Sequence, residues 1–268
     1  MAVIALLSDL GLRDSYVGVM KAVIYGIAPQ APLIDLSHEV QAHNVRDASF
    51  VLLTSYRYLP ENSLLCCVVD PGVGSHRRGV AVALRSEEGQ RLIYVGPDNG
   101  LATSLLERCS VEAAVSLENS QYQRHPVSAT FHGRDIFAPA AAHLFAGLDI
   151  EALGPSIAAS SLVHLAWPQA QQHAGVWHAH IINADRFGNL ITNIHVSNLQ
   201  PQPTNWQVSF GDHIHLGAIR RTFTDVHPGI PLAYIGSSGF MEIAIRDGNA
   251  KRDLEYDTET TLLVSPIA

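Results

Sequence analysis

The 268-residue sequence predicts an α/β fold in which a mostly parallel sheet domain (residues 1–160) is joined by a linker (161–175) to a smaller all-β, barrel-like domain (176–268). Three observations predict this division. Continuous apolar runs, typical of parallel strands covered on both faces, alternate with segments of helical period in the first half of the chain. Residues 153–175 are rich in Pro, Ser, Ala and Gln and show no period. Beyond them, short strand-like segments alternate with turns, which is typical of a small barrel or sandwich.

The elements of the N-terminal domain follow from the apolar pattern. Five strands are expected, over Val3–Asp9, Pro32–Ser37, Leu64–Asp70, Gly79–Leu84 and Leu92–Gly100. Three helices are expected, over Asp14–Pro29, Asn44–Pro60 and Arg134–Leu148. In the first helix Tyr16, Met20, Val23 and Ile27 recur at helical spacing, which predicts that they face the core. Because these strands alternate with helices, the sheet is expected to be mostly parallel.

The C-terminal domain is expected to contain short strands separated by turns. They are predicted over residues 176–185, 206–210, 212–216, 219–226, 232–245 and 261–267. This spacing favours an all-β domain.

Composition and charge limit the class of protein. Apolar residues make up 47% of the chain and charged residues 16%, which predicts a folded protein with a substantial core. The net charge of −8 would repel a nucleic-acid backbone, so no nucleic acid is expected as a partner. No stretch reaches the roughly 20 apolar residues of a membrane span, and the N-terminus lacks the basic segment of a signal peptide. We therefore expect a cytoplasmic protein without membrane contact.

The three cysteines show no pairing or metal-binding pattern. Cys66 and Cys67 are neighbours in a predicted strand, so they are expected to point to opposite faces of the sheet. Together with Cys109 they favour a reducing compartment.

Four acidic residues lie at predicted strand ends, where open α/β sheets bind ligands. They are Asp9, Asp35, Asp70 and Asp98. Asp9 is followed closely by Gly11 and could accept hydrogen bonds from two neighbouring hydroxyl groups, as a ribose requires. The alternative is that Asp9 caps the next helix or forms a local turn.

The segment VVDPGVGSHRR places Asp70 and Arg77 on either side of a Pro-Gly turn. A turn of this kind can bring the carboxylate and the guanidinium together over the strand ends, where each fixes the geometry of the other. His132, in SATFHGRDIF, precedes a predicted helix and is a candidate base or donor. The alternatives are a structural ion pair and a histidine that only caps its helix.

Two His-X-His pairs are candidate metal ligands: His178 with His180, and His213 with His215. Each pair would place two imidazoles on one strand face. Zinc requires three or four ligands, and no third ligand lies nearby in the sequence, so no metal is expected.

Two C-terminal segments could bind the ends of a nucleoside linked to an amino acid. In NADRFGNLITNI, Asn189 could meet a purine edge, Phe187 could stack on its face, and Asp185 could hold an ammonium group. In IGSSGFMEIAI, Ser237 and the neighbouring backbone N–H groups could bind a carboxylate. Each segment alone is also compatible with an ordinary turn.

Taken together, these segments resemble the SAM hydroxide adenosyltransferase family. The resemblance lies in SDLGLRDSYVGVMKAVI, LIDLSHEV, VVDPGVGSHRRGVAV, VGPDNG, SATFHGRDIFAPAAAHL, DRFGNLITNI and SSGFMEIA, which occur in the family's order and span nearly the whole chain. It implies hydrolysis of S-adenosyl-L-methionine (SAM) to adenosine and L-methionine, with no cofactor. It also implies a homotrimer with sites between the N-terminal domain of one subunit and the C-terminal domain of a neighbour.

The resemblance also implies a role for each candidate residue. Asp70, Arg77 and His132 correspond to the family's catalytic trio, and Asp9 corresponds to its ribose-binding acid. The family's residues that bind the methionine and adenine ends of SAM correspond to Asp185, Phe187, Asn189 and Ser237. Asn249 and Ala250 are expected near the adenine edge. In the hypothesis that follows, Arg77 stabilises hydroxide, Asp70 orients Arg77 and the water, and His132 accepts or relays the proton.

Three other functions are compatible with the sequence. A related enzyme could use a halide in place of water, although His132 and Gly133 stand where the halogenating relatives have tyrosine and serine. The chain could also be a SAM or adenosine sensor without activity, or a metal-dependent hydrolase that uses the paired histidines.

Overall fold

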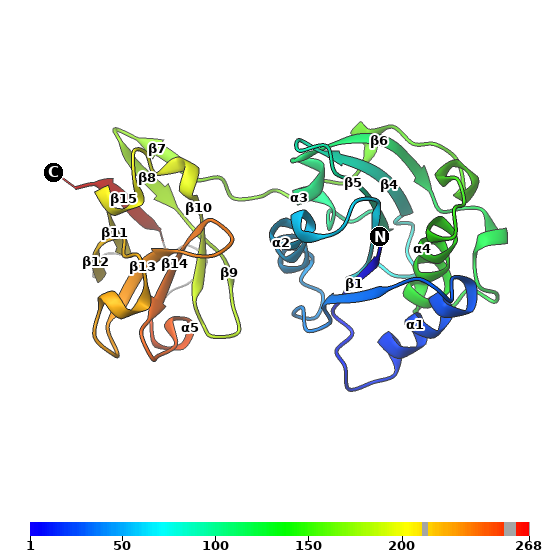
Figure 1. Cartoon of the computed structure of the whole chain (residues 1–268), viewed down its shortest axis with the longest axis horizontal. Helices are drawn as coiled ribbons and strands as arrows, with labels where there is room; N and C mark the ends of the chain where they lie inside the picture. The colour runs from blue at the N-terminus through cyan, green and yellow to red at the C-terminus, as the bar shows by residue number, and fades with distance from the viewer. Residues whose placement is uncertain (211–213, 255–260, 268) are drawn as a thin grey trace. The chain divides into compact units, whose positions relative to one another are not determined.

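The structure, a computed structural model, describes residues 1–210, 214–254 and 261–267. The chain forms two compact units, Met1–Leu165 and Ala166–Ala268 (Figure 1). The division lies inside the predicted linker, 161–175. Its residues include β7 (Gln171–His173), which pairs with β8 (Val176–Ala179). Both turn residues between these strands have positive φ angles, the geometry that favours a two-residue hairpin.

The first unit contains a six-stranded sheet of order β2-β1-β3-β5-β4-β6. Its strands are β1 (Ile4–Ser8), β2 (Leu33–Ser37), β3 (Ser63–Val68), β4 (Gly79–Ser86), β5 (Arg91–Pro97) and β6 (Cys109–Ser116). Parallel pairing joins β1 to β2 and β3, and β3 to β5, whereas β4 runs antiparallel to β5 and β6. The sheet is therefore mostly parallel, as predicted. The apolar pattern missed β6, because Ser110 and Glu112 interrupt it.

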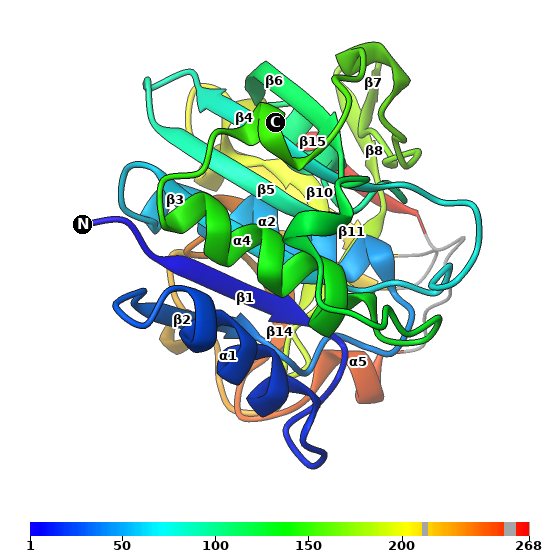
Figure 2. The same cartoon turned by 90° about the vertical axis from the view of Figure 1, so that its right-hand side faces the viewer.

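Helices cover both faces of this sheet. One face carries α1 (Tyr16–Ile27) and α4 (Ala138–Phe145), and the other carries α2 (Val45–Ser55) and α3 (Thr103–Leu106) (Figures 1 and 2). Neighbouring strand residues point to opposite faces, so Cys66 is buried under the first pair of helices and Cys67 under the second. The continuous apolar runs in the sequence are explained by this double covering.

The predicted core stripe of α1 is partly wrong. The buried residues are Val17, Met20 and Ile24, whereas Tyr16 is 46% exposed. The ring of Tyr16 instead meets Phe131 edge-on, with 5.2 Å between ring centroids. Tyr16 thus faces a neighbouring loop rather than the core, which a helical period alone does not reveal.

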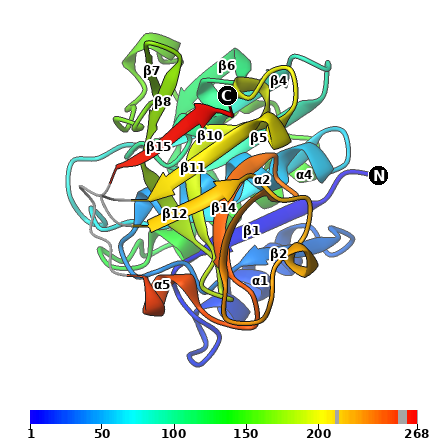
Figure 3. The same cartoon turned by 90° about the vertical axis from the view of Figure 1, so that its left-hand side faces the viewer.

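The second unit consists of two antiparallel sheets, of orders β13-β14-β10-β9 and β12-β11-β15-β8-β7 (Figure 3). The further strands are β9 (Ile181–Ala184), β10 (Leu190–His195), β11 (Trp206–Phe210), β12 (Ile214–Ala218), β13 (Pro231–Ile235), β14 (Phe240–Ile245) and β15 (Leu262–Pro266). Apolar residues of both sheets, among them Leu190, Phe210, Met241 and Val264, form one core. A short helix, α5 (Ala250–Asp253), follows β14. The all-β prediction for this region is confirmed.

Three strand predictions in the second unit differ from the structure, and a fourth lies partly outside the described residues. The segment 232–245 is divided into β13 and β14 by a turn at residues 236–239. Residues 219–226 form a loop with a 3₁₀ turn, because Thr222 and Asp225 cap each other's backbone groups. The segment 176–185 is broken at His180, whose backbone N–H donates to the side chain of Asn193 at 2.9 Å. Of residues 212–216, the first two lie outside the described residues and the rest belong to β12. Within the described part of the chain, no helix has both the length and the apolar character needed to cross a membrane.

Candidate active site

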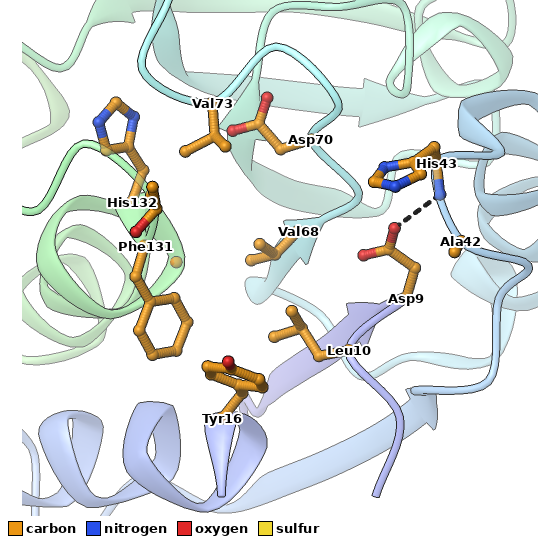
Figure 4. Close-up of a pocket in the computed structure, with 12 residues that line it drawn as sticks. Asp9, Leu10, Tyr16, Ala42, His43, Val68, Asp70, Val73, Phe131 and His132 are labelled. Atoms are coloured by element: carbon orange, nitrogen blue, oxygen red, sulfur yellow. Dashed lines mark hydrogen bonds between the residues drawn. The ribbon is translucent and has the colours of Figure 1, made fainter. Parts of the chain in front are cut away.

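Two of the predicted acidic residues meet at one cavity of the first unit. Asp9 directly follows β1, and Asp70 follows its parallel neighbour β3. Because parallel strands end at the same edge of a sheet, both side chains line a cavity of about 300 Å³. Figure 4 shows Asp9 on one side of this cavity, His132 on the opposite side and Asp70 between them.

The turn after Asp70 is closed by its own backbone. The N–H of Val73 donates to the carbonyl of Asp70 at 3.2 Å, and the N–H of Ser75 donates to that of Gly72 at 3.1 Å. Gly74 has a φ of +78°, and a Cβ atom there would lie 2.5 Å from the carbonyl oxygen of Ala129. Only glycine permits both this backbone angle and this close approach. The turn therefore packs directly against the loop that carries His132.

The three predicted catalytic side chains are in direct contact. The Arg77 Nε donates to Oδ1 of Asp70 at 2.8 Å, and its Nη2 donates to Oδ2. The same Nη2 donates to Nδ1 of His132 at 2.7 Å. Arg77 thus joins a carboxylate from the β3–β4 turn to an imidazole more than 50 residues later in the chain.

Arg77 supports the other two side chains from behind the cavity. Asp70 and His132 line the cavity, whereas Arg77 is absent from its described lining. The side chains of Asp70 and Arg77 are only 6% and 10% exposed, so their ion pair is screened little by water. The guanidinium also lies 5.2 Å from the ring centroid of the buried Phe137, which holds it by a cation–π contact.

The contact with Arg77 determines which nitrogen of His132 carries a proton. A guanidinium can only donate, so Nδ1 of His132 must accept, and the neutral ring carries its proton on Nε2. Burial, followed by the positive charge of Arg77, lowers the pKa of His132 against the opposing effects of Asp70 and Asp135. His132 is therefore neutral at pH 7.

A buried carboxylate anchors the loop that carries His132. Asp135 is fully buried and lies in a π-helical turn, Gly133–Phe137, that leads into α4. It accepts two hydrogen bonds from Arg134, at 2.6 and 2.7 Å, and one from the N–H of Ser128 at 2.9 Å. Burial alone would raise the pKa of Asp135, but these bonds outweigh it and lower that pKa. Asp135 thus fixes both ends of the segment around His132.

The other two acids at predicted strand ends are structural. Asp35 lies within β2 and binds Lys21 of α1 at 2.6 Å. Asp98 is buried and binds Arg78, and it also accepts from the N–H of Val163 at 2.8 Å. Neither lines the cavity, because each faces an ion-pair partner.

Several residues that line the cavity are not among those predicted from the sequence. Tyr16 and Phe131 form an aromatic wall, and His43 lies beside Asp9 (Figure 4). Thr130 and Phe131 could have been suspected as neighbours of His132. Nothing in the sequence pattern singled out His43, which lies in the loop before α2.

A cluster of predicted binding residues lies in the β9–β10 turn of the second unit. Asp185 accepts from the N–H groups of Phe187 and Asn189, at 2.9 and 2.8 Å, and from the Asn189 side chain at 2.8 Å. These bonds leave the ring of Phe187 projecting, and that residue is 76% exposed. The structure thus brings Asp185, Phe187 and Asn189 into one turn.

Asn249 and Ala250 lie against this turn. Asn249 is the N-cap of α5 and accepts from the N–H of Arg252 at 2.9 Å. The N–H of Lys251 donates to the carbonyl of Gly188 at 2.8 Å. A Cβ atom at Gly188 would overlap the Asn249 side chain, so this close packing requires glycine.

Ser237 lies away from the other C-terminal candidates. Leu190, next to the Asp185 turn, pairs with Ile243 of β14, whereas His195 pairs with Phe240 at the opposite end of β14. Ser237 is in the turn before Phe240. In this sheet the structure therefore places Ser237 and the Asp185 turn at opposite ends of one strand.

The described histidines of the two His-X-His pairs do not form a metal site. The ring of His178 in β8 meets that of His173 edge-on, whereas His180 lies outside the strand. His213 lies outside the described residues. Among the residues that the structure describes, no three His, Cys, Asp or Glu side chains are grouped to hold a metal ion.

Comparison with known proteins gives a consistent result along the whole chain. Residues 4–154 match the model of the SAM hydroxide adenosyltransferase N-terminal domain, and residues 179–262 match the model of its C-terminal domain. The chain is 38% identical over 259 residues to an (R)-S-adenosyl-L-methionine hydrolase of Thermus thermophilus, covering 92% of this chain and 93% of that protein. It is 27% identical to a fluorinase of an Actinoplanes species, covering 90% of each. An uncharacterized conserved protein from Thermotoga maritima, with a crystal structure, superimposes with a TM-score of 0.87 at 34% identity, covering 98% of this chain and all of the other.

Proposed function

This chain belongs to the SAM hydroxide adenosyltransferase family over both of its domains, and we propose on that basis that it hydrolyses SAM to adenosine and L-methionine. The observation that carries the proposal is the contact of Asp70, Arg77 and His132 at one end of a cavity that also contains Asp9. A hydrolase of SAM needs a group that binds the ribose and a group that activates water, and this arrangement can supply both.

In the proposed complex, Asp9 accepts hydrogen bonds from the ribose hydroxyl groups, which directs C5′ toward Asp70 and His132. The contacts of methionine and adenine are assigned to the second-unit residues that the family resemblance indicates, namely Asp185, Phe187, Asn189, Ser237, Asn249 and Ala250. The exposed ring of Phe187 supports this assignment, because a projecting aromatic side chain is suited to stacking on a base.

The reaction is a displacement at C5′. The oxygen of water attacks C5′, the C5′–S bond breaks, and its electron pair leaves on the sulfur of methionine. Since the sulfonium is already a good leaving group, catalysis must act on the water. Holding that water in line with the C5′–S bond can contribute up to roughly 7–11 kcal/mol in ideal cases.

The geometry suggests how the three side chains share the work. His132 can donate from Nε2 to the water oxygen while Arg77 occupies its Nδ1. The carboxylate of Asp70 lines the cavity and is suited to accept a proton of the water. Arg77 holds both groups and adds a positive charge near the forming hydroxide. If His132 instead accepts the proton, as the sequence-based hypothesis allows, its Nδ1 must first leave Arg77.

The pH dependence of the reaction tests the state of His132. Because its pKa is lowered, the neutral ring is the form present near pH 7, and a protonated ring would be repelled by Arg77. We expect kcat/KM to stay level from pH 8 to pH 7 and to fall only below about 6.5, the usual pKa of histidine. The measurement is adenosine formation across pH 5–8, with the His132→Gln variant as the control that should lose this acid limb. A fall that begins above pH 7 in the wild type would contradict a neutral His132.

The proposed function is tested by incubating the purified protein with SAM in halide-free buffer and separating the products by chromatography. We expect equal amounts of adenosine and methionine, unchanged by added chloride or fluoride. A 5′-halogenated adenosine on halide addition would favour the alternative suggested by the fluorinase relative. SAM binding without any product would favour a sensor.

We also propose the remaining family features for this chain. The protein would be a cytoplasmic homotrimer with its sites between subunits, and its reaction would need no cofactor. The mass of the particle in solution tests the number of subunits, and activity after dialysis against a chelator tests the need for a metal.

A further inference from the structure

His43 has an unusual backbone for its residue type. Its φ of +65° lies in the left-handed region, which side chains with a Cβ atom rarely adopt. Four non-glycine residues in the described part of the chain have positive φ angles: His43, Asn62, Ala174 and Asp247. Of these, His43 is the one that lines the cavity. Strained backbone at a ligand cavity suggests that the conformation itself is needed there.

The backbone N–H of residue 43 points at Asp9. This N–H donates to Oδ2 of Asp9 at 2.8 Å (Figure 4). An ionised carboxylate has about four acceptor sites, so one such bond fixes its orientation and leaves capacity for two hydroxyl groups. The φ angle sets how this N–H is oriented relative to the chain that continues into α2, so a negative φ would displace either the N–H or that segment.

The segment before His43 fixes the other side of the Asp9 loop. The His38 ring lies 2.7 Å from the hydroxyl of Ser8, the residue before Asp9. The carbonyl of His38 accepts from the N–H of Gly11 at 2.7 Å. Residues 38–43 therefore bind Ser8 before Asp9, Gly11 after it, and the Asp9 carboxylate.

We propose that the left-handed backbone of His43 is a positioning element that orients Asp9 toward the ribose hydroxyl groups, and that the imidazole is not required for this. The inference rests on the proposed function insofar as the ligand carries a ribose. It predicts that the φ preference of residue 43 controls discrimination between adenosine and its deoxy analogues.

The test compares His43→Gly, His43→Asn and His43→Val by calorimetric binding of adenosine, 2′-deoxyadenosine and 3′-deoxyadenosine. Wild type should bind at least one deoxy analogue about 10-fold more weakly than adenosine, because a hydroxyl bonded to a carboxylate is lost. Glycine and asparagine tolerate positive φ, so both variants should keep this ratio within about twofold. Valine opposes positive φ, so it should weaken adenosine binding by about 5- to 30-fold and bring the ratio close to one.

The matched control is Asn62→Val, which introduces the same residue at another left-handed position, with φ of +61°, outside the described cavity lining. It should destabilise the fold without changing the adenosine ratio. Loss of discrimination in His43→Gly would overturn the proposal in favour of the imidazole. Unchanged discrimination in His43→Val would overturn it as well. Should the valine variant not fold, the glycine variant decides alone, because it keeps the N–H and removes the side chain.

Failure of the proposed function has a different signature. If wild type binds adenosine but forms none from SAM, the proposed hydrolysis is wrong. The inference about His43 is then still tested by the ratios of adenosine to deoxyadenosine affinity. If wild type binds adenosine without any preference over its deoxy analogues, the positioning of Asp9 toward the ribose is overturned even when SAM is hydrolysed.

Discussion

Replacing Arg77 with methionine is expected to lower kcat for SAM hydrolysis by about 10²–10³, with a change in SAM affinity of less than about tenfold. Arg77 donates to both oxygens of Asp70 and to Nδ1 of His132, so its removal frees both side chains at once. Because it lies outside the described cavity lining, its loss should affect the chemical step more than binding. Single-turnover formation of adenosine, with SAM affinity from the concentration dependence, measures the two effects separately.

The Arg77→Lys variant separates charge from geometry. Lysine keeps the positive charge but presents no planar fork that could serve two carboxylate oxygens and an imidazole together. We expect it to lose nearly as much activity as Arg77→Met. If Arg77→Lys kept most of the wild-type kcat, catalysis would depend on the positive charge at this position and not on the planar geometry of the guanidinium.

The neighbouring arginine provides a matched control. Arg78 also pairs with a buried carboxylate, since its Nε and Nη2 both donate to Oδ2 of Asp98, and it donates to the carbonyl of Ser161 as well. Neither of its partners lines the cavity. Arg78→Lys should therefore lower the melting temperature while leaving kcat within a few-fold of wild type. An equal loss of kcat in both lysine variants would show that the effect at Arg77 is a general loss of structure.

Replacing Asp70 with asparagine is expected to lower kcat by about 10²–10⁴. The substitution keeps the shape of the side chain but removes the charge that accepts a water proton in the proposed mechanism. It also leaves the guanidinium of Arg77, which is 10% exposed, without its anionic partner. Breaking a buried pair by removing one partner costs about 3–5 kcal/mol, so the free energy of unfolding should fall as well. Denaturant unfolding and single-turnover kinetics on the same preparation measure both effects.

The acid limb of the pH profile should move in a defined direction in this variant. The negative charge of Asp70 raises the pKa of His132, so its removal lowers that pKa further. The residual activity of Asp70→Asn should accordingly persist to a lower pH than that of wild type. A limb that moved to higher pH would contradict the assignment of this limb to His132.

Asp98→Asn is the control for Asp70→Asn. It also removes the charge of a buried carboxylate that binds an arginine, since the side chain of Asp98 is 4% exposed and that of Arg78 is 33% exposed. It should cost stability without a comparable loss of turnover. If Asp98→Asn lowers kcat as strongly as Asp70→Asn, the special role proposed for Asp70 is wrong.

The amino-acid pattern was sufficient for the architecture wherever local and global preferences agree. The continuous apolar run of β1 is buried on both faces, and the C-terminal turns separate antiparallel strands. It failed where tertiary contacts override the pattern. Tyr16 fits the helical stripe of α1 but faces Phe131, and residues 219–226 turn because of a capping box.

The candidate site shows the same limit. In the sequence, Asp35 and Asp98 lie at predicted strand ends just as Asp9 and Asp70 do. In the structure, Asp35 forms an ion pair with Lys21, and Asp98 forms one with Arg78. His43 carries no signal of its own, since its importance lies in a φ angle and a backbone N–H. Lys21 and Arg78 lie 14 and 20 positions away from Asp35 and Asp98 in the chain, so the residues next to these two acids do not reveal their partners.

The sequence by itself determined the two-domain α/β and β organisation, the family, and the residue types at Asp70, Arg77 and His132, because periodicity and motifs are local properties. Only the tertiary structure decided that Arg77 lies between the other two, that His132 accepts through Nδ1, and that Ser237 lies apart from the Asp185 turn. The physical reason is that hydrogen bonds and desolvation depend on the distance between groups in space, and that distance is set by the packing of the whole sheet.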